Sequence, residues 1–156
     1  MRALLAFAIL VLAGCTPAAL VAAQTTVATA ANAEVAGIKA FVAFDQQHRA
    51  AILAEATAGQ KDRALDDLRA YEPQQAKVAA GFHALDGALV AANTTITAVA
   101  AKKLTLDSLA GVAASIMSAA QQVYSAAQLL GLDVPAINKL LGVTPATLPQ
   151  TLGGGQ

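Results

Sequence analysis

The side chains best suited to chemistry in this sequence form two pairs of histidine and aspartate. Asp45 and His48 are three residues apart, and His83 and Asp86 have the same separation. On a helix, residues three apart lie on one face, so each pair offers two ligands of the kinds that bind zinc. Four ligands would come together only if the two pairs lay side by side.

The expected hairpin keeps these pairs apart. A turn near Gly59–Gln60 places His48 level with Tyr71. The same turn places His83 level with about Val35–Ala36. At about 1.5 Å of rise per residue, the two histidines are roughly 18 Å apart along the helix axis. We therefore expect no metal site.

The same register gives each histidine a tyrosine neighbour. His48 lies level with Tyr71, and a second turn near Lys103–Leu104 brings His83 level with Tyr124. We expect each histidine either to form a hydrogen bond with its tyrosine across a helix pair or to lie at the surface. Both roles are structural.

Covalent catalysis lacks a suitable nucleophile. The serines of residues 108–125 have no histidine or lysine nearby in the sequence. Asp66 and Asp67 are adjacent, so they point apart on a helix, and they suit ion pairs with Arg69 and Arg63 on a solvated face. No glycine-rich phosphate loop is present in the sequence. We expect no enzyme, no catalytic residues and no cofactor.

Composition favours an all-α protein. The 156 residues are 56% hydrophobic and 13% charged, and 41 of them are alanine, the strongest helix former. Ten basic and ten acidic residues cancel, which argues against a nucleic-acid partner. The single cysteine excludes an intrachain disulfide framework.

Apolar residues recur at helical spacing in three long segments. The first segment spans about 26–58, and its expected packing face holds Val35, Ile38, Phe41, Val42, Asp45, His48, Ile52 and Leu53. The second follows steps of four and three without a slip through Ala64, Leu68, Tyr71, Gln75, Val78, Phe82, Leu85, Leu89, Ala92, Ile96 and Val99. Because this spacing continues across Pro73, we favour one kinked continuous helix there. The alternative is a break, with Pro73 at the first position of a new helix.

The third helix is expected from about Asp107 to Leu130, followed by Gly131 and a short helix from Pro135 to Leu141. Three long helices joined by short turns predict an elongated antiparallel three-helix bundle, running up, down and up, with a short fourth helix. Residues 26–141 form this bundle, and residues 142–156 are expected to be a flexible tail.

The N-terminal segment predicts processing. Arg2 precedes an uncharged apolar run from Ala3 to Ala13, which is typical of a secretory signal and shorter than the roughly 20 residues of a membrane span. The run ends in Leu12, Ala13, Gly14 and Cys15, which resemble the lipobox of bacterial lipoproteins.

That resemblance implies a signal peptide of residues 1–14, cleaved before Cys15, and a lipidated Cys15 that anchors the protein. Residues 15–25 would then be the lipidated cysteine and a short tether. Because Thr16 rather than aspartate follows the cysteine, the resemblance favours the outer membrane. Several acyl chains on one residue give stable anchoring.

We therefore expect a lipid-anchored, non-enzymatic helical protein on the periplasmic face of the outer membrane, acting as a structural or protein-interaction module. Its partners would be the membrane, through Cys15, and an envelope protein or a second copy of the chain. Two alternatives stay open: a phage- or plasmid-encoded lipoprotein for lysis or superinfection exclusion, and a carrier of an apolar small molecule. Insertion of the uncharged segment Ser108–Leu132 into a membrane also stays open.

Overall fold

The computed structural model describes residues 16–143 and is all-helical over that range, as the sequence predicts. The described helices are α2 (Thr16–Thr57), α3 (Lys61–Ala100), α4 (Ser108–Leu129) and α5 (Pro135–Leu141). The signal peptide 1–14, Cys15 and residues 144–156 of the expected tail lie outside this range.

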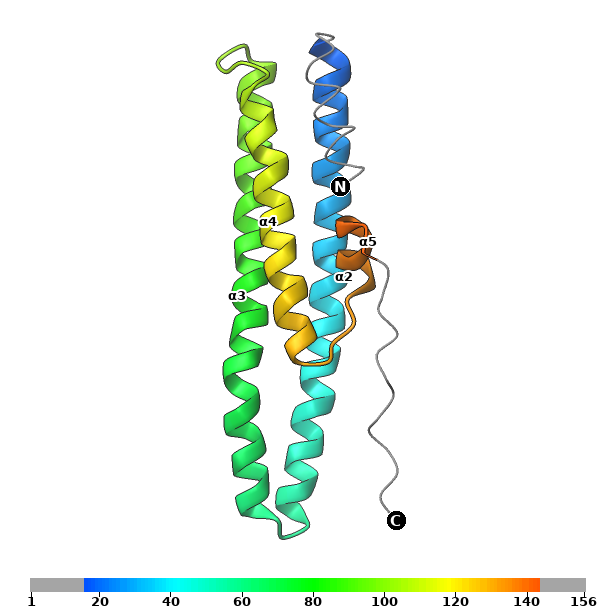
Figure 1. Cartoon of the computed structure of the whole chain (residues 1–156), viewed down its shortest axis with the longest axis vertical. Helices are drawn as coiled ribbons and strands as arrows, with labels where there is room; N and C mark the ends of the chain where they lie inside the picture. The colour runs from blue at the N-terminus through cyan, green and yellow to red at the C-terminus, as the bar shows by residue number, and fades with distance from the viewer. Residues whose placement is uncertain (1–15, 144–156) are drawn as a thin grey trace.

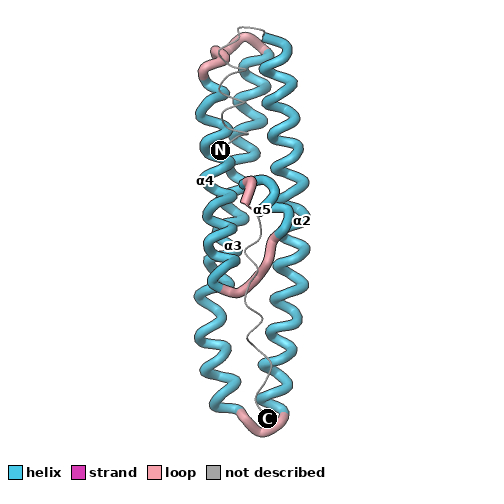
Figure 2. The backbone as a smooth tube through the Cα atoms, turned by 45° about the vertical axis from the view of Figure 1, so that its right-hand side comes forward, coloured by secondary structure: helices cyan, strands magenta, loops and turns pink. Residues whose placement is uncertain are grey.

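The three long helices pack together lengthwise. Figure 1 shows α2 and α3 side by side along the molecule, joined at one end by residues 58–60. The shorter α4 lies along the half of α3 that is farther from this turn, and α5 packs against α2 and α4 (Figure 2). Near the turn, the molecule is therefore a two-helix hairpin.

The predicted packing face of α3 is confirmed. Nine of its eleven positions are buried, and Leu68 and Gln75 are half-buried. The helix continues across Pro73, as expected from the unbroken spacing. Five of the buried positions form the main hydrophobic core together with buried residues of α2, α4 and α5, namely Val78, Phe82, Leu85, Leu89 and Ala92. Ile96 and Val99 lie in a second, smaller cluster. The longest predicted pattern thus marks the central helix of the fold.

The predicted helix ends after the first and third helices are confirmed. Gly59 has a φ of 89° and Gly131 a φ of 67°, the left-handed backbone that glycine adopts without strain. The third helix was expected over about 107–130 and is observed over Ser108–Leu129. Pro135 begins α5, where its missing N–H would be unpaired in any case.

The expected tether is wrong over residues 16–25, because α2 begins at Thr16 rather than near residue 26. The segment is rich in alanine and lacks charge, so it favours a helix. Ala23 is buried in a second apolar cluster with Ile96, Val99 and Leu109. Tertiary packing against the far end of α3 therefore extends α2.

The expected packing face of the first helix is also partly wrong. Phe41 is buried, but Val35, Ile38, Val42 and Leu53 are exposed. The helix instead packs through its smallest residues, including the buried Ala30, Ala33 and Gly37. A Cβ at Gly37 would lie 2.9 Å from the Phe82 ring, so the absence of a side chain sets this close approach.

Two glycines of α3 allow a matched test of close helix packing. A Cβ at Gly81 would lie 3.1 Å from backbone atoms of Val123 in α4, whereas a Cβ at Gly87 meets nothing within 4 Å. We expect Gly87→Ala to raise the free energy of unfolding by about 0.5–1 kcal/mol. We expect Gly81→Ala to lower it by about 1 kcal/mol, because α3 and α4 must separate. Urea unfolding followed by circular dichroism measures both, and equal gains would contradict the close approach.

Candidate functional site

The structure places His48 beside Tyr71, as the hairpin register predicts. Their ring centroids are 4.2 Å apart, with an angle of 34° between the ring planes. The hydrogen bond expected between them is wrong, because the Tyr71 hydroxyl instead donates to Asp45 Oδ1 at 2.8 Å. A carboxylate is the stronger acceptor, and Asp45 lies one helical turn before His48.

Asp45 is well satisfied at this position. Arg49 Nε donates to both of its carboxylate oxygens, at 3.0 and 3.2 Å, and the Arg49 guanidinium lies 5.8 Å from the centroid of the Tyr71 ring. Burial, and then the hydrogen bond and charge of Asp45, raise the pKa of Tyr71 far above its ordinary value. Tyr71 therefore keeps its proton, and the cluster joins α2 to α3.

His83 follows the other expectation and lies at the surface. Tyr124 pairs instead with Gln128, whose side-chain amide donates to its hydroxyl. The structure does not bring His48 and His83 together. Within residues 16–143, no group of three or more histidine, cysteine, aspartate or glutamate residues could hold a metal ion.

The two predicted ion pairs near the start of α3 are present. Arg63 lies 3.9 Å from Asp67, and Arg69 lies 3.3 Å from Asp66. All four side chains are well exposed, so solvent screens the pairs and each adds at most about 1 kcal/mol. Asp66 and Asp67 therefore belong to a solvated face.

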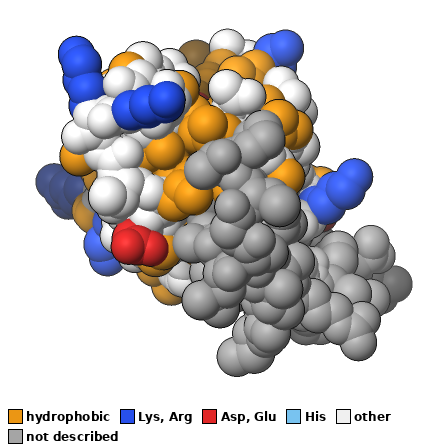
Figure 3. All heavy atoms as spheres, turned by 90° about the horizontal axis from the view of Figure 1, so that it is seen from above, with side chains coloured by type: hydrophobic (Ala, Val, Ile, Leu, Met, Phe, Trp, Pro, Cys, Tyr) orange, Lys and Arg blue, Asp and Glu red, His pale blue; other side chains and the backbone are white. Residues whose placement is uncertain are grey.

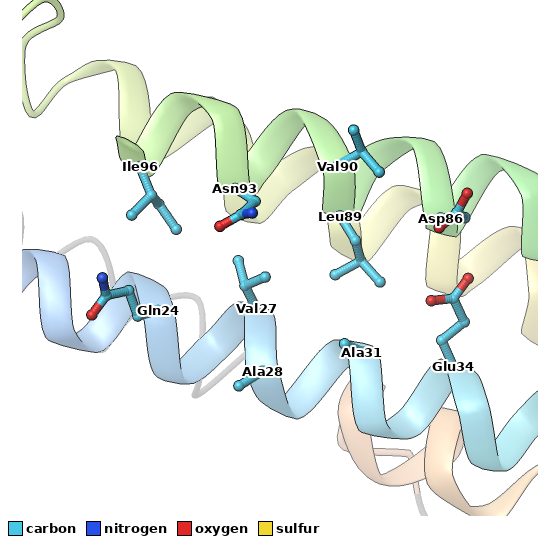
Figure 4. A pocket seen from close by; sticks show the side chains of 10 residues that line it. All are labelled: Gln24, Val27, Ala28, Ala31, Glu34, Asp86, Leu89, Val90, Asn93 and Ile96. Carbon is cyan, nitrogen blue, oxygen red and sulfur yellow. The ribbon is translucent and has the colours of Figure 1, made fainter. Parts of the chain in front are cut away.

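The feature most like a binding site is a groove between α2 and α3, which we call the α2–α3 groove. It consists of two open stretches of about 430 and 450 Å³ that share Glu34 and Asp86. Figure 4 shows these two side chains facing each other from opposite helices, with α4 and α5 behind. Apolar side chains line both stretches, among them Val27, Leu89, Val90, Ile96, Ile38, Val42 and Phe82.

Glu34 is the unusual group in this groove. Only 8% of the surface of Glu34 is exposed to solvent. Among the described residues, none forms a hydrogen bond or an ion pair with its carboxylate. Burial, and to a smaller extent the negative charge of Asp86, raise the pKa of Glu34 above its ordinary value. The groove therefore offers negative charge in an apolar setting, which suits a cationic group.

Sequence reasoning missed Glu34. It singled out Asp86 only as a possible partner of His83, whereas the structure places Asp86 opposite Glu34. The hairpin register contained the signal, because a turn centred at Gly59–Gln60 puts position 34 level with position 85. Applying it to every charged residue, and not only to the histidines, would have found the pair.

One described helix is long and apolar enough to cross a membrane by length and composition alone. It is α2 over Ala18–Thr57, with a mean hydropathy of 1.3 in its most apolar window. This is weak evidence, because core helices and signal sequences pass the same test. The uncharged segment Ser108–Leu132 does not pass it, and α4 packs against α3 in the main core.

Comparison with known proteins gives this chain no relatives: no family model, no curated protein and no solved structure matches it. Function must therefore be argued from the residues and their arrangement.

The Asp45–Tyr71 bond can be tested by removing one hydroxyl. We expect Tyr71→Phe to lower the free energy of unfolding by about 1–2 kcal/mol, because a part-buried hydrogen bond to a carboxylate is lost while the ring remains. Tyr124→Phe is the matched control and is expected to be nearly neutral, since its hydroxyl is bonded at an exposed site. Chemical unfolding measures both, and equal losses would contradict a specific role for Tyr71.

The buried Glu34 predicts a stability that depends on pH. A folded-state pKa above the ordinary 4.5 means that the folded chain binds this proton more readily than the unfolded chain, so stability falls as pH rises through that pKa. In dilute solution, Glu34→Gln should raise the melting temperature at pH 7, and the gain should shrink as pH falls toward 4.5. Glu72→Gln, at an exposed position of α3, should leave it unchanged. A gain that does not vary with pH would contradict the buried charge.

Proposed function

We propose that the protein is a lipid-anchored, non-enzymatic module of the bacterial envelope, held on the periplasmic face of the outer membrane by acyl chains on Cys15. The observation that carries this proposal is the run Leu12, Ala13, Gly14 and Cys15 after a short apolar segment. Its body is an up-down-up helical rod that presents a surface to an envelope protein or to a second copy.

The start of α2 supports this arrangement. Thr16, the first described residue, is already part of the helix. A lipid on Cys15 would therefore be attached one residue before a helical segment that belongs to the rod. The anchor would then hold the rod close to the bilayer, since the first turn of α2 and the rest of α2 form one continuous helix.

The charge at the same end of the molecule also supports it. The first turns of α2 pack near the α3–α4 connection, because Ala23 and Leu20 share a cluster with Val99 and Leu109. Lys102 and Lys103 are exposed in that connection. Figure 3 looks onto this end and shows Lys and Arg side chains projecting from its rim. Basic side chains near a membrane surface are attracted to anionic lipid.

An interaction role is supported by the exposed apolar side chains. Val35, Val42 and Val90 are 52%, 46% and 60% exposed. Val42 and Val90 line the α2–α3 groove, and Val35 directly follows Glu34, which lines both stretches. Apolar side chains gathered on one face are typical of a surface that binds another protein. The serine and threonine hydroxyls that form hydrogen bonds among the described residues all donate to backbone carbonyls, and the proposal assigns no reaction.

Metabolic labelling of the producing bacterium with a radioactive fatty acid tests the anchor. We expect wild-type protein to carry label and to sediment with outer membranes on a density gradient, whereas Cys15→Ser should be unlabelled, because the acyl acceptor is gone. A second variant, Cys15→Ser with Ala43→Cys, restores a thiol at an exposed site outside the motif and should also be unlabelled. Label retained in Cys15→Ser would refute the proposal.

A further inference from the structure

An exposed seam runs along α2. Its positions are separated alternately by three and four residues, which is the spacing of a coiled-coil interface. In heptad notation, the a positions are Val21, Ala28, Val35 and Val42, and the d positions are Gln24, Ala31, Ile38 and Asp45. Six of the eight are exposed, and Ala31 and Asp45 are half-buried. We call this set the α2 seam.

Two residues of opposite charge flank the α2 seam, at the separation expected for an ion pair between two parallel helices. Glu34 occupies a g position and Lys39 the next e position, five residues later. In a parallel two-stranded coiled coil, a g residue of one helix lies beside the following e residue of the other helix. Lys39 is exposed, and no ion pair joins it to any described residue. Each copy thus carries an unpaired anion and an unpaired cation at matching places.

We propose that the α2 seam is a homodimer interface, in which a second copy packs in parallel and in register. Lys39 of each copy would then enter the α2–α3 groove of the other and pair with Glu34, close to Asp86. The interface rests on the described residues alone. A parallel dimer places both N-terminal ends together, so both lipid anchors would enter one membrane. This further expectation rests on the proposed function.

The state of Glu34 favours this occupant. Little of the Glu34 residue is exposed and no cation lies beside its carboxylate, which is unfavourable for the charged form, and an incoming ammonium group relieves that cost. The groove beside Glu34 is open and lined by the exposed Val90 of α3, so the second copy would also cover apolar surface. The unpaired charge of Glu34 and the apolar lining of the groove therefore both favour a second copy of the chain as the partner.

The seam also favours parallel over antiparallel packing. Valine occupies three of the four a positions, and β-branched a residues suit two strands in a parallel coil. The g-to-e separation of Glu34 and Lys39 fits a parallel in-register pair without further adjustment. The seam ends at Asp45, where the carboxylate is already bonded to Arg49 and Tyr71.

Cysteine cross-linking of the full-length chain, purified in detergent, tests the geometry. We expect Gln24→Cys and Ile38→Cys each to give an oxidised dimer on a non-reducing gel, because both d positions face their counterparts in a parallel pair. An antiparallel pair allows this at only one position. Ala43→Cys, exposed but outside the seam, is the control and should not cross-link. Cross-linking at neither seam position, or at only one, would overturn the proposal.

Charge exchange tests the pairing. Analytical ultracentrifugation should show that Lys39→Glu raises the dimer dissociation constant by at least about tenfold, because like charges then face each other twice. Glu34→Lys combined with Lys39→Glu should restore it. Since Lys39 is exposed, Lys39→Glu is expected to keep the helical circular dichroism spectrum even if Glu34→Lys alone unfolds the chain. A monomer at every concentration, or a Lys39→Glu variant that dimerises like wild type, would overturn the interface.

These outcomes are separable from those of the anchor. All cross-linking variants are made with Cys15 and again with Cys15→Ser, so that a native thiol cannot produce the dimer band. If the chain that keeps Cys15 carries no fatty-acid label but still cross-links at both seam positions, the anchor alone is refuted. Retained label with no cross-linking would refute the interface alone.

Discussion

The close packing of α3 between its neighbours is the interaction on which the rest of the structure depends. Its buried face supplies side chains to both apolar clusters, and Gly81 lets the backbone of α4 approach where a Cβ would lie 3.1 Å from Val123. Alanine-rich helices bury little area per residue, so short separations must supply dispersion contacts that larger side chains would otherwise give. The fold is therefore sensitive to added volume where its helices cross, as at Gly37 and Gly81.

Two carboxylates on α2 show how the same helix pair treats charge in two ways. Asp45 receives hydrogen bonds from Arg49 and Tyr71, and so its burial between α2 and α3 is compensated. Glu34 lies three turns earlier, is more deeply buried, and faces another acid instead. The hydrogen-bonded cluster around Asp45 therefore stabilises the contact between α2 and α3. The Glu34 carboxylate has no partner of opposite charge within one chain. The presence or absence of such a partner, rather than the depth of burial, separates a stabilising cluster from a candidate binding site.

The sequence predicted the all-helical class, the α3 packing face and the glycine helix ends, because each depends on local spacing or backbone geometry. It mistook the packing face of α2, because periodicity favours the largest apolar side chains. The structure packs the alanines and Gly37 inward and leaves Val35, Ile38 and Val42 outside. A helix with small residues on one side and valines on another has two faces that could pack against other helices. The spacing of residues within that helix does not show which of the two faces is buried. Glu34 was missed for a related reason, since its significance comes from Asp86 across the hairpin.

The unequal helix lengths explain why the free surface lies on α2. With 22 residues, α4 is about half as long as α3, and the seven residues of α5 cover only part of α2. Both lie on one side of the α2–α3 pair, so the opposite side keeps its groove, in which Figure 4 shows the exposed Val90. A fourth long helix would complete the layer, and the chain has none among its described residues. The charges beside the groove, Glu34 and Lys39, then argue that the missing helix is α2 of a second molecule, because one copy offers both halves of the pair but cannot join them on its own surface.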